Sequence, residues 1–219
     1  MNTTDALHWI DSETEDAMQD EHGFIWKAVL DTVDVDLGGT RVLDVGCNQG
    51  GFLRLLSDTT AITEGFGYDP AAAAVEIAQA KRGSRPLTFS VADKPPSSWI
   101  GFDLAFSHEV IYLMHDLPEH ARTIRDALLP GGIYYAVMGA HAANSMMVGW
   151  HREFSKKLDM PPIYSLSEVA SVFDDEGFDG SCGALRYGFI PTTGHTEPDL
   201  SRWLDYYHRE KVIFRFKRR

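Results

Sequence analysis

The sequence predicts an α/β fold built around a mainly parallel sheet. Short apolar runs alternate along its 219 residues with segments of helical spacing, which is typical of crossover connections between parallel strands. Each run has about the length of a buried strand. The predicted strands are residues 41–45, 65–69, 87–91, 102–106 and 132–137, with a final strand at 211–216.

Two of the predicted helices have clear boundary signals. Ser165 and Glu168 form a capping-box pattern, and Gly177 stands where a cap glycine is expected, so we predict a helix over 166–176. Asp116 directly precedes the segment Leu-Pro-Glu and is predicted to cap a second helix, in whose first turn proline is tolerated.

The acidity of the chain is concentrated near its N-terminus. The formal net charge is −12, and residues 1–40, with ten acids and one base, account for −9 of it. Apolar residues at helical spacing in this segment are Ile25, Ala28, Val29 and Val33. We therefore expect a helical extension over 1–39 that packs on a single domain over 40–219, covering its functional site or pairing with the basic C-terminus.

Composition and charge exclude several classes of protein. A chain this acidic has no surplus of cations for phosphates, and a charged strand end explains the bases at the C-terminus, so we expect no nucleic-acid partner. Two cysteines, Cys47 and Cys182, cannot form a disulfide framework, and no apolar run approaches the roughly 18 residues of a membrane span. We expect a cytoplasmic monomer or homodimer with no membrane partner.

A glycine-bearing turn follows the first predicted strand. Gly46 and Gly50 flank the turn, and a helical pattern begins at once after it, so a ligand can approach the backbone and the free amides of the helix. Asp44 lies near the end of the first strand, Asp69 ends the second and Asp93 ends the third. Three successive strands thus deliver an acid to one sheet edge, where a carboxylate can accept hydrogen bonds from ribose hydroxyls.

These motifs resemble those of the class I S-adenosylmethionine-dependent methyltransferases, in particular the small-molecule group. Residues 44–50 resemble the first motif of that family and 67–70 its second, with the ribose-binding acid. Segments 102–107 and 129–132 are similar to its fourth strand and to the turn before its fifth. The resemblance implies a Rossmann-like, doubly wound sheet of seven strands, mainly parallel with an antiparallel last strand.

The resemblance also implies S-adenosyl-L-methionine as the cofactor. The cofactor-binding residues that it implies are Asp44, Gly46, Cys47, Asn48, Gly50, Asp69, Pro70, Ala92, Asp93, Ser107 and His108. Asn48 replaces a glycine of the first motif, and asparagine tolerates the positive φ that this position often needs. A dinucleotide-dependent oxidoreductase is the competing interpretation, but its Gly-x-Gly-x-x-Gly spacing is absent.

Candidate catalytic residues are few, because methyl transfer depends mostly on alignment and exclusion of water. His108 and His141 follow the fourth and fifth strands, and either can act as a base for a hydroxyl acceptor, or simply form local hydrogen bonds. Tyr112 is a weaker candidate that can equally pack as a pocket wall. No histidine pair has the spacing of a zinc site, so we assign no metal.

The long connection over 142–165 is the expected substrate lid. Its methionines and aromatic residues suit an adaptable apolar wall, with Arg152, Lys156 or Lys157 available for an acidic group of the substrate. His22, Phe24 and Trp26 are expected to close the pocket from the opposite side.

We expect an enzyme that transfers a methyl group to an O or N atom of a small molecule. The alternative is a non-catalytic S-adenosylmethionine-binding regulatory or partner protein, because the cofactor motif is clearer than any catalytic one.

Overall fold

A computed structural model describes residues 12–157, 159–189 and 200–219, and the first eleven residues of the expected extension lie outside this range. Seven strands form one sheet in the order β3-β2-β1-β4-β5-β7-β6. The parallel strands are β1 (Arg41–Val45), β2 (Glu64–Asp69), β3 (Leu87–Val91), β4 (Phe102–His108) and β5 (Leu128–Met138). The last strand, β7 (Val212–Arg218), runs antiparallel between β5 and β6 (Phe178–Ala184). The predicted seven-stranded, mainly parallel α/β fold is confirmed.

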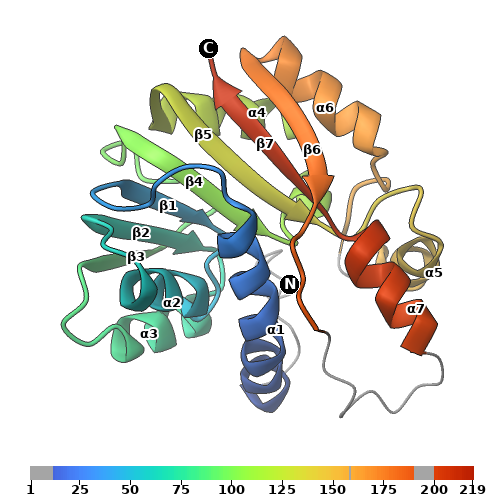
Figure 1. Cartoon of the computed structure of the whole chain (residues 1–219), viewed down its shortest axis with the longest axis horizontal. Coiled ribbons are helices and arrows are strands. Elements are labelled where there is room, and N and C mark those ends of the chain that lie inside the picture. The colour runs from blue at the N-terminus through green and yellow to red at the C-terminus, as the bar shows by residue number, and fades with distance from the viewer. Residues whose placement is uncertain (1–11, 158, 190–199) are drawn as a thin grey trace.

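Helices cover both faces of the sheet (Figure 1). The face with α1 (Ser12–Thr32), α2 (Gly51–Thr59) and α3 (Ala72–Lys81) carries one apolar cluster, and the face with α4 (Leu117–Ala127) and α6 (Leu166–Asp175) carries another. Because strands β1 and β4 lie between these layers, their side chains are buried almost throughout. This explains why the strands appear in the sequence as continuous apolar runs.

The remaining elements gather near the end of the sheet where β1 to β5 terminate (Figure 1). They are the short 3₁₀ helix Ile111–Leu113, α5 (Ser145–Phe154), α7 (Leu200–Asp205) and the π-helical turn Tyr206–Glu210 that precedes β7. Single π-helical turns occur often at functional sites. Among the described residues, no helix combines the length and apolarity needed to cross a membrane.

The boundary signals in the sequence act as predicted. Ser165 and Glu168 form a reciprocal capping box at the start of α6, and Gly177 adopts a positive φ of 94° after its end. Asp116 accepts a hydrogen bond of 2.8 Å from the backbone N–H of Glu119 and so caps α4.

Strand β6 is the one strand that the apolar runs do not identify. Six of its seven residues are exposed, and it contains two glycines, so no buried pattern marks it. Its place in the sheet depends on the long antiparallel pairing with β7, in which Phe178 opposes Arg218.

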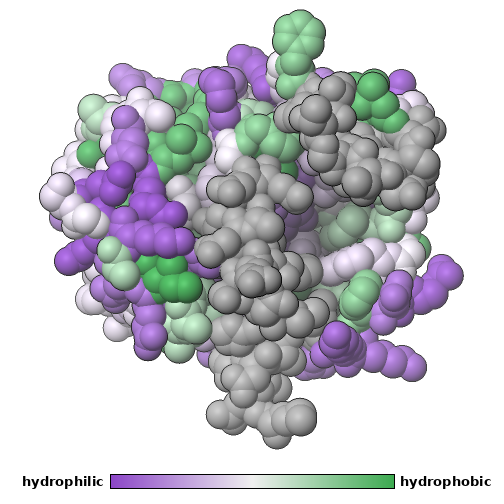
Figure 2. All heavy atoms as spheres, turned by 90° about the horizontal axis from the view of Figure 1, so that it is seen from below, coloured by the Kyte–Doolittle hydropathy of each residue, from purple (hydrophilic) through white to green (hydrophobic). Residues whose placement is uncertain are grey.

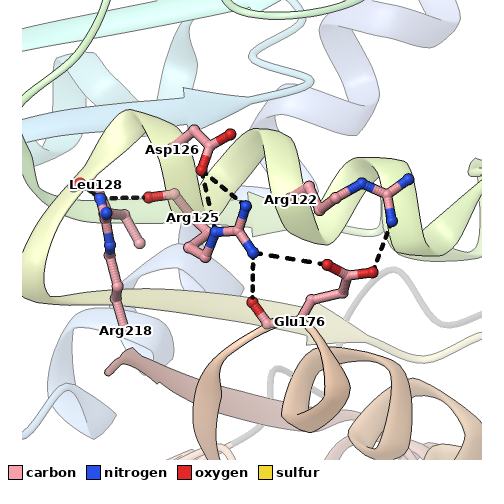
Figure 3. A network of polar contacts seen from close by, with 6 residues as sticks. All are labelled: Arg122, Arg125, Asp126, Leu128, Glu176 and Arg218. Carbon is pink, nitrogen blue, oxygen red and sulfur yellow. Dashed lines mark hydrogen bonds and ion pairs between the residues drawn. The ribbon is translucent and has the colours of Figure 1, made fainter.

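A basic residue near the C-terminus forms hydrogen bonds with other elements of the same chain. Arg218 donates to the carbonyls of Arg125 and Leu128, while Glu176 binds Arg122 at 2.6 Å and Arg125 at 3.7 Å (Figure 3). This network joins α4, β5, the end of α6 and β7.

A second basic residue, Arg215, contacts the N-terminal segment. Its Nε lies 3.0 Å from Oδ1 of Asp34, which also accepts a hydrogen bond from the hydroxyl of Tyr135 at 2.5 Å. The expected pairing between the acidic N-terminal segment and the basic last strand therefore occurs at Asp34, and Ile25, Ala28 and Val29 pack α1 into the core.

Candidate functional site

A cavity of about 600 Å³ lies where the parallel strands end, and this side of the molecule is visibly hollowed (Figure 2). Its walls come from the ends of β1, β2 and β4, from the helices α1 and α5, and from the π-helical turn before β7. In sheets of this kind ligands bind outside the carboxyl ends of the strands. The cavity therefore lies where the topology predicts a ligand site.

The turn after β1 brings bare backbone to the cavity. Gly46 has a φ of 68°, and a Cβ at this position would lie 2.6 Å from the side chain of Val110. Gly50 has a φ of 71° and precedes α2; a Cβ there would lie 2.6 Å from the ring of Phe89. Both positions need glycine for backbone conformation and for space.

Asn48 takes the conformation predicted for it, with a φ of 46°. Its Oδ1 is buried and, among the described residues, has no hydrogen-bond partner. Because buried polar atoms are nearly always paired, this oxygen is available to a bound ligand.

Asp69 is held in place by two backbone amides. Its Oδ2 accepts from the N–H of Asn48 and its Oδ1 from the N–H of Ala71, each at 2.9 Å. Asp69 also lines the cavity, and a carboxylate has about four acceptor positions, so it can accept hydrogen bonds from hydroxyl groups there.

Asp44 is a buried carboxyl group at the same edge. Its Oδ2 has no partner among the described residues. Burial, reinforced by the negative charge of Asp69, raises the pKa of Asp44 well above its ordinary value. A cation in the cavity would relieve both effects, so the geometry favours a positively charged ligand.

Nine of the residues predicted for the site line this cavity. They are Asp44, Gly46, Cys47, Asn48, Asp69, Pro70, Asp93, His108 and Tyr112. The structure places four others elsewhere: Gly50 caps α2 behind the turn, Ala92 packs against the core, and Ser107 hydrogen-bonds to the Tyr134 hydroxyl at 2.6 Å. His141 is buried, with its Nε2 2.7 Å from the carbonyl oxygen of Glu210.

His108 belongs to a polar cluster on the β7 side of the cavity. Its Nε2 lies 3.3 Å from Nζ of Lys211, which also binds Oε1 of Glu109 at 2.7 Å. Burial, together with the charge of Lys211, lowers the pKa of His108 well below its ordinary value. His108 is therefore neutral at physiological pH.

Helix α1 covers the cavity with His22 and Trp26. The ring of His22 packs edge-on against that of His108, with centroids 4.6 Å apart, and burial lowers the pKa of His22 to about 4. Trp26 packs against Phe52 of α2. The third residue expected in this cover, Phe24, packs instead against Tyr187 and Tyr207.

The opposite wall is apolar. Met147 and Trp150 of α5 line the cavity, and Trp150 packs edge-on against Tyr112. The cationic residues expected to reach an acidic substrate group, Arg152, Lys156 and Lys157, are exposed and are not among the lining residues.

Lys211 and Tyr206 are lining residues that sequence reasoning missed. Because β7 is antiparallel to β5, Val212 pairs with Met138, and the residue before β7 therefore lies at the edge where the parallel strands end. A lysine directly before an antiparallel last strand is the signal that could have identified Lys211. Among the described residues, no group of three or more His, Cys, Asp or Glu side chains is placed to hold a metal ion.

Comparisons with known proteins point to one family. The family model described as "Methyltransferase domain" matches residues 15–181. The chain is 32% identical over 113 residues, 49% of its length, to a tRNA U34 carboxymethyltransferase of Pseudomonas fluorescens (strain Pf0-1). It is 23% identical over 159 residues, 69% of its length, to a malonyl-[acyl-carrier protein] O-methyltransferase of Legionella pneumophila. It spans 35% and 56% of the lengths of these two relatives.

Solved structures share the fold over nearly the whole chain. A chain from the complex between the Haloferax volcanii Trm112 methyltransferase activator and a methyltransferase superposes with a TM-score of 0.82 at 24% identity, covering 99% of this chain and 97% of that one.

Proposed function

The chain belongs to the class I S-adenosylmethionine-dependent methyltransferases, and on this premise we propose that its cavity binds S-adenosylmethionine and transfers the methyl group to an O or N atom of a small molecule. The observation that carries the proposal is the set of acids at the ends of the first three strands, Asp44, Asp69 and Asp93, all of which line one cavity.

The lining residues suit this cofactor. Asp44 and Asn48 each present a buried oxygen without a partner among the described residues, and Gly46 keeps the adjoining backbone bare. S-adenosylmethionine carries an ammonium and a sulfonium group, for which an unpaired buried carboxylate is a favourable neighbour. Asp69 lines the cavity, and its carboxylate can accept hydrogen bonds from ribose hydroxyls.

When bound, the cofactor supplies an electrophilic methyl group on sulfur. The chain orients the two reactants and excludes water, an effect that can reach about 7–11 kcal/mol. His22 and Trp26 of α1 and Trp150 of α5 line the cavity from two sides, so the side chains that would shield the bound reactants from water come from distant parts of the sequence.

The walls beyond the cofactor residues favour a small acceptor with an apolar body. Leu113, Met114, Met147 and Trp150 line this part, and a volume of about 600 Å³ lies in the range of small-molecule pockets. We place the wall that recognises the acceptor in segment 142–165, because α5 lies within it.

Charge disfavours a nucleic-acid acceptor. Among the described residues that line the cavity, Lys211 is the only lysine or arginine, and Glu109 already neutralises it. A polyanion such as tRNA, the acceptor named for the Pseudomonas fluorescens relative, would need several cations here.

The test is transfer of label from S-adenosylmethionine carrying a tritiated methyl group to two separate pools, a small-metabolite extract and bulk tRNA. We expect tritium in the metabolite fraction, and less of it with Asp69→Ala. A matched control is Asp58→Ala, because Asp58 is an exposed acid that pairs with Arg85 away from the cavity. Label in tRNA alone would overturn the acceptor class, and label in neither pool would overturn the enzymatic proposal.

A further inference from the structure

A buried lysine contacts His108 at the wall of the cavity. The side chain of Lys211 is only 2% exposed, and its Nζ lies 2.7 Å from Oε1 of Glu109 and 3.3 Å from Nε2 of His108. A lysine is not needed there to pair β5 with β7, because that pairing begins with Val212. Its contacts are instead with residues that line the cavity.

Glu109 is fixed as firmly as its partner. It adopts a positive φ of 59°, which is costly for a residue with a side chain, and its Oε2 accepts a hydrogen bond of 3.1 Å from the backbone N–H of Gly139. Backbone strain of this kind persists only where surrounding contacts impose it and occurs often at functional sites. The strained turn thus holds a carboxylate against Lys211.

The ion pair between Lys211 and Glu109 keeps Lys211 protonated, and this determines which ring nitrogen of His108 carries a proton. Burial alone would lower the pKa of Lys211, but the charge of Glu109 beside it raises the pKa above its ordinary value. An ammonium group has donors only, so in the contact with His108 it is Lys211 that donates and Nε2 that accepts. A neutral imidazole whose Nε2 accepts carries its own proton on Nδ1.

The other groups around His108 do not restore a positive charge to it. His22 of α1 faces it edge-on and is itself held neutral by burial, and the negative charge of its chain neighbour Glu109 is balanced by Lys211, against which Tyr206 lies with its ring centroid 5.3 Å from Nζ. Among the described residues, His108 forms no hydrogen bond through Nδ1. Because His108 lines the cavity, the N–H on this nitrogen can donate to a molecule bound there.

We propose that Lys211 is a positioning residue that fixes His108 as the neutral tautomer protonated on Nδ1, so that His108 offers the methyl acceptor a hydrogen-bond donor instead of a base. The part of this proposal in which His108 donates to the methyl acceptor rests on the proposed function. The part in which His108 is protonated on Nδ1 does not. It follows that the acceptor presents a lone pair to His108, such as a carbonyl, ether or phenolate oxygen or an unprotonated nitrogen. A phenolate has already released its proton to solvent before methyl transfer, and a neutral amine releases its proton to solvent from the methylated ammonium afterwards, so neither acceptor needs His108 as a base.

The test is nitrogen-15 NMR of the histidine side chains, which distinguishes the two neutral tautomers and the imidazolium. The His108 signals are assigned by their absence from the spectrum of His108→Gln. In the wild-type protein we expect the Nδ1–H pattern at neutral pH, persisting as pH falls through the ordinary histidine range. Lys211→Arg should keep this pattern because it retains a donor. Lys211→Met should lose it, giving the other tautomer or a titrating imidazole, whereas Lys217→Met on the exposed side of β7 should change nothing.

The wild-type spectrum alone can overturn the proposal, even if Lys211→Met fails to fold. An Nε2–H pattern or an imidazolium at neutral pH would do so, and so would an unchanged His108 pattern in a folded Lys211→Met protein. The spectrum is recorded without cofactor or acceptor, so it can contradict the proposed tautomer even if the protein transfers methyl groups. The reverse outcome, the expected tautomer in a protein without turnover, would overturn the proposed function and not the tautomer.

Discussion

The backbone N–H of Asn48 donates a hydrogen bond of 2.9 Å to Oδ2 of Asp69. This bond ties the turn after β1 to the acid at the end of β2. Because the same carboxylate also accepts from the N–H of Ala71, its orientation is set before any ligand arrives. The two motifs that are separate in the sequence therefore form one preorganised wall of the cavity.

The positive φ of Asn48 predicts an unusual order of stability among its variants. Asn48→Gly should leave the free energy of unfolding within about 0.5 kcal/mol of wild type, because glycine adopts this conformation freely. Asn48→Ala should lower it by about 1–2 kcal/mol, the approximate cost of a left-handed conformation for a residue with a Cβ. Urea unfolding measures both values, and an alanine variant as stable as the glycine variant would contradict the account.

The buried carboxyl group of Asp44 should lower the stability of the protein and strengthen its binding of the cofactor. Its raised pKa means that the folded protein holds this proton at pH values where the unfolded chain has released it. Stability is therefore lost as pH rises from the ordinary aspartate range through the raised pKa. Asp44→Asn should increase the free energy of unfolding at neutral pH, on the order of 1 kcal/mol, and weaken binding of S-adenosylmethionine.

Thermal unfolding with and without S-adenosylmethionine separates the two effects of Asp44→Asn. The variant should melt higher than wild type alone and gain less from the cofactor. A variant that melts lower alone and gains as much as wild type would show that the buried carboxyl group serves the fold and not the ligand.

His120 predicts a loss of stability in mild acid. It is a buried residue of α4, with its Nε2 3.2 Å from the Tyr134 hydroxyl, and burial lowers its pKa to about 4. Between about pH 6.5 and pH 4 the unfolded chain binds a proton that the folded protein does not, so stability falls as pH falls, by up to about 3 kcal/mol. His22 acts in the same direction over the same range.

The check is urea unfolding from pH 7 to pH 4.5, on wild type and on His120→Gln. The variant should show a shallower dependence of stability on pH, whereas His208→Gln, at an exposed position, should follow wild type. Equal slopes for wild type and His120→Gln would contradict the assignment.

Much of the fold could be predicted because its strands are buried on both faces and its helices carry explicit boundaries. Ser165 and Asp116 cap the helices that their patterns predicted, and Asn48 has the positive φ expected of a residue replacing glycine. Strand β6 could not be found because its exposed residues leave no hydrophobic period, and only its pairing with β7 makes it a strand.

The candidate site also has one part that the sequence predicts and another that it does not. Its cofactor side follows from local motifs, since Asp44 and Asp69 stand at the ends of strands that the sequence marks clearly. The side of the cavity around His108 depends on contacts between residues that are distant in the sequence. Lys211 contacts His108 from 103 residues away, and His22 of α1 packs against the same ring. His141 had the same sequence signal as His108, but its ring turns to the carbonyl of Glu210, a contact that no local pattern indicates.

The central claim, that this cavity binds S-adenosylmethionine through the acid at the end of β2, is tested most directly by calorimetric titration of wild type and Asp69→Ala. We predict one site per chain and a loss in the variant of about 1.5–3 kcal/mol, the usual value of a hydrogen bond to a charged group. This is roughly a 10- to 150-fold weaker affinity. Asp58→Ala, the exposed control, should bind as wild type does. Absence of binding by wild type, or equal affinity of wild type and Asp69→Ala, would contradict the account.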